Sequence, residues 1–101
     1  MKRAKLDGRY TANRRWGYNY SVTIPSWNWN DYYKAKKIAV DMFGTSHDVK
    51  RRYIFRDDQE RLLTAEWAFH YEKTSKPTVI YFRNEKYMEQ VLMMFALTKG
   101  A

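Results

Sequence analysis

The 101-residue sequence contains no cysteine, so disulfide bridges and thiolate-bound zinc are excluded. Proline and glycine number only two and four, and no repeat, linker or low-complexity segment interrupts the chain. No run of about eighteen apolar residues is present, as a membrane-spanning helix would require. The basic start of the chain also lacks the apolar stretch of a secretory signal. We therefore expect a cytoplasmic protein with no membrane contact.

Catalytic signatures are missing as well. The sequence has no glycine-rich phosphate loop, nucleophile elbow or zinc-ligand spacing. His47 and His70 could act as an acid and a base, but they are read better as a turn residue and a strand-surface residue. Asp57 and Asp58 are read as part of a polar turn and not as magnesium ligands. We expect a protein that is not an enzyme and has no metal or cofactor.

Acidic residues are few compared with basic ones: 11 against 19, which gives a net charge of +8 and a pI of about 9.8. The surplus is uneven, because residues 1–56 carry 13 Lys/Arg and 4 Asp/Glu, whereas residues 57–101 carry 6 and 7. A surplus of positive charge favours anionic partners. We expect nucleic acid, either DNA or RNA, with an acidic host protein as the alternative.

The length allows one small domain, and alternation of apolar and polar residues predicts its strands. Leu63–Tyr71 alternates over nine residues and is interpreted as the central strand, flanked by Val49–Arg56 and Thr78–Phe82. Tyr18–Ile24 is a further strand, although the pattern does not say where it joins the sheet. A rival interpretation makes Asp57–Trp67 a helix, because its residues are good helix formers.

Two helices are predicted from apolar residues at helical spacing, over Asp31–Phe43 and Asn84–Leu97. The order is strand, helix, strand, strand, strand, helix. We expect a small two-layer α+β domain over residues 16–101, with an antiparallel sheet of three to four strands. Both helices should cover one face and leave the other in solvent. Residues 1–15 are interpreted as a flexible basic arm, because they have no clear periodicity.

Basic and aromatic residues mix in the first half of the chain, where cations could follow phosphates and rings could stack on bases. The same residue types dominate protein interfaces, so a protein-binding inhibitor or adaptor remains the alternative. The predicted binding residues are Arg14, Arg15, Trp16, Trp27, Trp29, Lys34, Lys37, Lys50, Arg51 and Arg52.

The order helix, three strands, helix over Asp31–Leu97 resembles the double-stranded-RNA-binding domain. That family opens its second helix with lysines, whereas Asn84–Glu89 here contains one lysine and two glutamates. The resemblance therefore implies a topology and no RNA-contact residue.

A second resemblance rests on the helix that ends Asp41-Met42-Phe43-Gly44 and on the run Tyr81–Glu85 that leads into the last helix. These features resemble small uncharacterised proteins of tailed bacteriophages. Those proteins also pair a helix ending in Phe-Gly with a late strand that continues into a closing helix. The resemblance implies a viral accessory or host-takeover protein.

Overall fold

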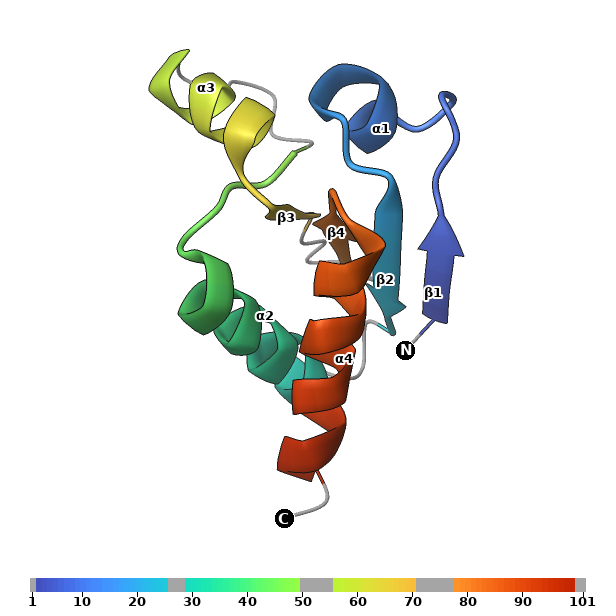
Figure 1. The fold of residues 1–101 in the computed structure, drawn as a ribbon, viewed down its shortest axis with the longest axis vertical. Coiled ribbons are helices and arrows are strands. Elements are labelled where there is room, and N and C mark those ends of the chain that lie inside the picture. The colour runs from blue at the N-terminus through green and yellow to red at the C-terminus, as the bar shows by residue number, and fades with distance from the viewer. Residues whose placement is uncertain (1, 26–28, 50–55, 71–77, 100–101) are drawn as a thin grey trace.

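The structure is a computed structural model that describes residues 2–25, 29–49, 56–70 and 78–99. In this part of the chain, four strands and four helices follow one another (Figure 1). They are β1 (Lys2–Lys5), α1 (Thr11–Trp16), β2 (Tyr20–Ile24), α2 (Trp29–Phe43), α3 (Arg56–Thr64), β3 (Trp67–His70), β4 (Thr78–Phe82) and α4 (Glu85–Lys99). The predicted α+β class is confirmed. The predicted element order lacked β1, α1 and α3.

The four strands form one antiparallel sheet in the order β1-β2-β4-β3. β2 and β4 are its central strands, with Val22 opposite Ile80 and Tyr20 opposite Phe82. The predicted strand Tyr18–Ile24 is thus confirmed in its main part, and it joins the sheet between β1 and β4. The prediction of a central strand at Leu63–Tyr71 was wrong, because β3 covers only Trp67–His70 and lies beyond β4.

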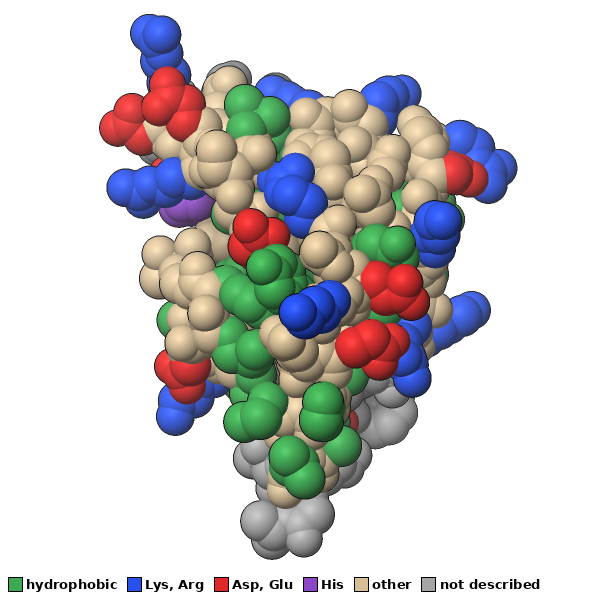
Figure 2. Space-filling view, in the orientation of Figure 1, with side chains coloured by type: hydrophobic (Ala, Val, Ile, Leu, Met, Phe, Trp, Pro, Cys, Tyr) green, Lys and Arg blue, Asp and Glu red, His purple; other side chains and the backbone are tan. Residues whose placement is uncertain are grey.

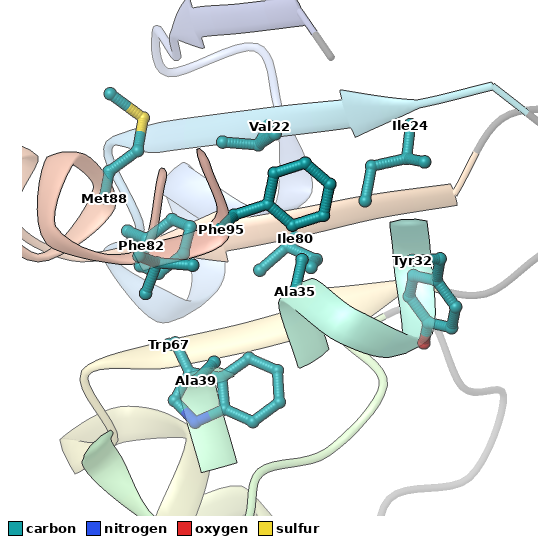
Figure 3. Packing of buried hydrophobic residues seen from close by; sticks show 11 residues of the cluster. Val22, Ile24, Tyr32, Ala35, Ala39, Trp67, Ile80, Phe82, Met88 and Phe95 are labelled. Carbon is teal, nitrogen blue, oxygen red and sulfur yellow. The ribbon is translucent and has the colours of Figure 1, made fainter. Parts of the chain in front are cut away.

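α2 and α4 pack on one face of the sheet, as predicted. The main core lies between these helices and the strands, and its buried side chains are Val22, Ile24, Tyr32, Ala35, Ala39, Trp67, Ile80, Phe82, Met88, Val91 and Phe95 (Figure 3). Gly44 follows α2 with φ of +89°, a conformation that glycine adopts without a Cβ clash. Asn84 caps α4, since its Oδ1 accepts the Lys86 backbone N–H at 2.9 Å.

The opposite face of the sheet is covered in part, although we expected it to lie in solvent. A second buried cluster consists of Leu6, Ala12, Trp16, Tyr18, Val49, Leu62, Ala68 and Tyr81. α1 supplies two of these residues and α3 supplies one. These two helices were absent from the predicted order, so their apolar residues had no place in it.

The polar run after residue 56 is a helix, so the rival interpretation was correct as far as Thr64, where α3 ends. Asp57 and Asp58 occupy the first turn of α3 and Arg61 the last, which suits the helix dipole. Leu62 is fully buried, whereas Leu63 is 55% exposed, so the alternation that began at Leu63 was misleading. Helix propensity therefore predicted the structure of this segment correctly, whereas the alternation of apolar and polar residues did not.

The predicted strand Val49–Arg56 falls mostly outside the described residues. Its last residue, Arg56, is the first residue of α3 and does not belong to a strand. At the start of the predicted strand, Asp48 forms an isolated parallel bridge with Phe69, and the Val49 N–H donates to the Phe69 carbonyl at 2.9 Å. This short pairing places residues 47–49 beside the edge of β3 that does not face β4.

Residues 2–16 contain β1 and α1, whereas we predicted an arm without regular structure over residues 1–15. β1 pairs with β2 over all of its four residues, with Arg3 opposite Val22 and Lys5 opposite Tyr20. Leu6 and Ala12 are buried in the second cluster. β1 contains no large apolar residue, and all four of its side chains are exposed, so no alternation of buried and exposed residues could reveal it.

Candidate nucleic-acid interface

β1, α1 and the turn between them carry a group of basic side chains that we call the N-terminal basic surface: Lys2, Arg3, Lys5, Arg9, Arg14 and Arg15. All six are exposed, and Asp7 is the one acidic residue of this stretch. In Figure 2, Lys and Arg side chains follow the right-hand edge of the molecule, over the place of β1 in Figure 1. The cations thus lie on an edge strand, on the turn after it and on a short helix that packs on the face of the sheet opposite α4.

Two of the six cations already have acidic partners. Arg9 forms an ion pair with Asp7 at 2.8 Å, and its backbone N–H donates to the same carboxylate. Hydrogen bonds from Arg9 hold the pKa of Asp7 below its usual range, and the carboxylate raises the pKa of Arg9. Arg3 forms an ion pair with Glu89 of α4. These two arginines are therefore less available to an anionic ligand.

The other four cations, Lys2, Lys5, Arg14 and Arg15, form no ion pair with any described residue. Arg14 and Arg15 lie in the last turn of α1, where positive charge is favourable. The guanidinium of Arg15 lies 4.7 Å from the centre of the Trp16 ring. Phosphate oxygens would complete the hydrogen bonding of these groups without displacing a carboxylate.

Trp16 is a core residue and not the exposed ring that we predicted. Its side chain is only 3% exposed and belongs to the second cluster. Burial is explained by helix geometry, because Ala12 and Trp16 are four residues apart and share the inward side of α1. A ring buried in this way cannot stack on a base.

Of the remaining predicted residues, the two lysines of α2 do not join this surface. Lys34 and Lys37 are exposed on α2, which lies on the other side of α4 from β1 (Figure 1). Trp29 is the first residue of α2. Trp27, Lys50, Arg51 and Arg52 lie outside the described residues. Of the ten predicted residues, the structure thus places Arg14 and Arg15 on the N-terminal basic surface.

The position of α1 depends on Arg83, which sequence reasoning missed. Its guanidinium donates to three backbone carbonyl oxygens: Trp16 at 2.8 Å, Leu62 at 2.8 Å and Ala65 at 3.0 Å. These carbonyls belong to the C-terminal ends of α1 and α3, where helices leave acceptors without internal donors. The arginine therefore joins both helices to the end of β4. Its place in the predicted strand-to-helix turn gave no sign of this role.

Tyr18 strengthens the same junction. Its ring lies under the Arg83 guanidinium at 4.5 Å, and its hydroxyl donates to the Leu62 carbonyl at 2.8 Å. The side chain is fully buried, and burial raises the pKa of Tyr18 to about 12. Burial likewise raises the pKa of Tyr81 to about 12. Both phenols are therefore neutral hydrogen-bonding groups at neutral pH.

Each histidine lies beside a carboxylate, which the sequence did not predict. His70 Nδ1 lies 2.9 Å from Asp48 Oδ1, and His47 Nε2 lies 3.3 Å from Asp58 Oδ1. The pairs connect residues 47–48 to β3 and to α3. Among the described residues, no group of three or more histidine and acidic side chains is arranged to hold a metal ion.

An open groove of about 280 Å³ lies between β1 and the start of α4. Arg3 and Lys5 line it from β1, Glu85 and Glu89 line it from α4, and Tyr20 and Met88 contribute apolar surface. Charges of both signs meet there, so the groove itself is not a strongly basic site. Of the four unpaired cations, Lys5 lines the groove, whereas Lys2, Arg14 and Arg15 do not.

Comparisons with protein-family models, with curated proteins and with solved structures found no match. None of the helices within the described ranges is both long and apolar enough to cross a bilayer.

Proposed function

We propose that this protein is a non-enzymatic accessory protein that binds nucleic acid through the phosphate backbone. The observation that carries the proposal is the group of four exposed cations, Lys2, Lys5, Arg14 and Arg15, without acidic partners among the described residues. They stand on β1 and α1, which are held by strand pairing and by Arg83. Phosphate contacts of this kind give affinity without reading the base sequence.

Salt dependence tests the proposal directly. Each phosphate neutralised on a duplex contributes about −0.9 to the slope of log affinity against log salt, so four cations predict a slope of roughly −3.6. Labelled duplexes of unrelated sequence should bind with similar affinity. Binding no tighter than about 100 μM at low salt, the weak end of non-specific affinity, would remove nucleic acid as the partner.

Charge reversal tests whether nucleic acid binds at the N-terminal basic surface. The double variant Arg14→Glu/Arg15→Glu should weaken binding to all sequences alike and make the slope less negative by about 2. Lys34→Glu/Lys37→Glu is the matched control, because it makes the same change in net charge on exposed residues of α2. Equal losses from the two double variants would mean that net charge, and not this surface, governs binding.

Protein binding is a second candidate, supported by a different observation. Met93, Met94 and Leu97 are exposed on α4, at 60%, 46% and 66%. Figure 2 shows hydrophobic side chains over the lower half of this helix. Exposed methionines suit a surface that adapts to a protein partner. Under this proposal the protein is an inhibitor or adaptor, and its capture of a partner from host lysate would survive nuclease treatment.

A further inference from the structure

β1 is the edge strand of the sheet, and within the described part of the chain nothing pairs with its outer side. All four of its side chains are exposed. An edge strand carries a row of backbone donors and acceptors that can take up another strand. The other edge differs, because Phe69 of β3 already hydrogen-bonds with residues 47–49.

The register of β1 identifies the groups that face outward. The Leu6 N–H donates to the Asn19 carbonyl at 2.7 Å, which continues the β1–β2 register and makes position 6 one whose N–H faces β2. Hydrogen-bonded pairs alternate with non-bonded pairs along an antiparallel ladder. Ala4 therefore turns its N–H and C=O toward β2. Arg3 and Lys5 turn theirs away, toward the free edge.

A second copy of the chain does not suit this edge. In an antiparallel pairing of two such edges, the bonded positions would be Arg3 and Lys5 of each copy. Every such register places a cation of one copy opposite a cation of the other, and directly opposed like charges are destabilising. The net charge of +8 on each copy adds to the repulsion.

We propose that the outer edge of β1 binds an acidic segment of a partner protein, which adds to the sheet as an antiparallel fifth strand. Acidic side chains of the segment lie opposite Arg3 and Lys5 and form cross-strand pairs of opposite charge. Their backbone groups accept and donate the hydrogen bonds that Arg3 and Lys5 direct outward. This site goes beyond nucleic-acid binding, because it uses backbone groups that phosphate contacts leave free.

The surroundings of β1 favour acidic residues opposite Lys5 in particular. Arg3 and Lys5 share the α4 side of the sheet with the open groove. Arg3 is already paired with Glu89, whereas Lys5 has no ion pair with a described residue. A carboxylate opposite Lys5 therefore meets a cation that has no ion pair with a described residue, at the side of a groove that Glu85 and Glu89 also line. The apolar surface of Tyr20 and Met88 lies in the same groove, next to the added strand.

Three versions of one peptide test the proposal on the unmodified protein. The probe is a capped, fluorescently labelled hexapeptide in which glutamate and threonine alternate. One version is N-methylated at every glutamate and another at every threonine, so both keep the same charge. In an antiparallel strand with glutamates opposite Arg3 and Lys5, only the glutamate amides face β1. Binding is measured by fluorescence anisotropy at low salt.

Strand addition predicts that methylation at glutamate weakens binding by about tenfold or more, because hydrogen bonds to β1 are lost. Methylation at threonine should change affinity by less than about twofold, since those amides face solvent. Equal binding by the three peptides would show that charge alone attracts them. That result, or a loss confined to the threonine version, overturns the proposal.

Variants of Lys5 provide the matching test on the protein. Lys5→Ala and Lys5→Pro both remove the cation, but only proline also removes the outward N–H. Proline is tolerated on an edge strand where its missing N–H would face solvent, and equal thermal unfolding of both variants checks this. Lys5→Pro should bind the peptide more weakly than Lys5→Ala by about fivefold, and equal affinity contradicts strand addition.

The proposal of a peptide site and the proposal of a nucleic-acid surface can be tested separately. Arg14→Glu/Arg15→Glu should weaken duplex binding and leave the relative affinities of the three peptides unchanged. If duplex binding is absent but the methylation pattern holds, the peptide site stands alone. If the duplex binds and the methylation pattern is absent, the edge site is excluded and the nucleic-acid proposal is unaffected.

Discussion

Arg83 Nη1 donates a hydrogen bond of 2.8 Å to the carbonyl oxygen of Trp16, 67 residues earlier in the chain. The same guanidinium also donates to the carbonyl oxygens of Leu62 and Ala65 at the C-terminal end of α3. One side chain at the end of β4 therefore fixes the C-terminal ends of both helices that cover the second face of the sheet. The placement of Arg14 and Arg15 on the surface depends on this contact.

Arg83→Ala should lower the free energy of unfolding by about 2–4 kcal/mol, because it leaves helix-end carbonyls without a charged donor. Chemical denaturation measures the loss. Arg61→Ala is the control, since Arg61 is exposed on α3 and should change stability by less than about 0.5 kcal/mol. Similar values for the two variants would show that the Arg83 hydrogen bonds contribute little.

Three glycines allow a graded test of the same junction. Gly17 has φ of +82°, and a Cβ there would lie 2.8 Å from Arg83 Nη1. Gly44 has φ of +89° with nothing within 4 Å of its Cβ position, and Gly8 also has nothing within 4 Å. Gly44→Ala should cost about 1 kcal/mol for the left-handed conformation. Gly17→Ala should cost more, because the arginine must move, and Gly8→Ala should cost least.

Trp67 is the largest fully buried side chain among the described residues, and its indole N–H donates to the Gly44 carbonyl at 2.8 Å. Trp67→Ala should destabilise the protein by about 3–5 kcal/mol, since it opens a cavity between the sheet and α2. Trp67→Phe keeps part of the packing and removes the hydrogen bond, so its cost should be smaller. Denaturation of both variants checks the order, and an equal loss would argue against a packing role.

Helices α2 and α4 could be predicted because their apolar residues recur at helical spacing on a face that becomes buried. Tyr32, Ala35 and Ala39 are buried as expected. At the ends of these stripes the pattern is less accurate, since Met94 lies within the predicted helix Asn84–Leu97 and is 46% exposed. The pattern gives the face of a helix, but the edge of that face depends on its neighbours.

α1 and β1 could not be predicted, because distant contacts hold them. α1 has only six residues, which is too short to be stable alone, and it depends on burial of Ala12 and Trp16 and on Arg83. The candidate site could be predicted only in part for the same reason. Charge identified Arg14 and Arg15 correctly as exposed cations, whereas composition could not show that Trp16 turns inward.

The raised pKa values of Tyr18 and Tyr81 predict a loss of stability in alkali. Each has a pKa of about 12 in the folded protein against an ordinary value of 10.0, so the folded state holds these protons more tightly. Their contribution is complete below pH 10 and is lost as pH rises toward 12, at up to about 1.4 kcal/mol per pH unit for each phenol.

Denaturation at pH 9 and pH 11 isolates this effect when variants are compared, because lysines also titrate in this range. Tyr18→Phe should show a smaller fall in the free energy of unfolding than the unmodified protein, since one buried phenol has been removed. Tyr20→Phe is the control on β2, where the side chain is only half-buried. A fall of the same size in all three proteins would contradict the assigned cause.

Amide hydrogen exchange along β1 tests the folded N-terminus and its register together. The N–H groups of Ala4 and Leu6 face β2, and the Leu6 N–H donates to Asn19 at 2.7 Å. Those of Arg3 and Lys5 face the free edge and have no partner within the described chain. Exchange should therefore alternate, with Ala4 and Leu6 protected and Arg3 and Lys5 close to the rate of an unfolded peptide. Uniformly fast exchange over residues 2–6 would support the flexible arm that the sequence predicted. Protection of Arg3 and Lys5 instead would shift the register by one residue and move the outward-facing groups to Ala4, where no cation stands.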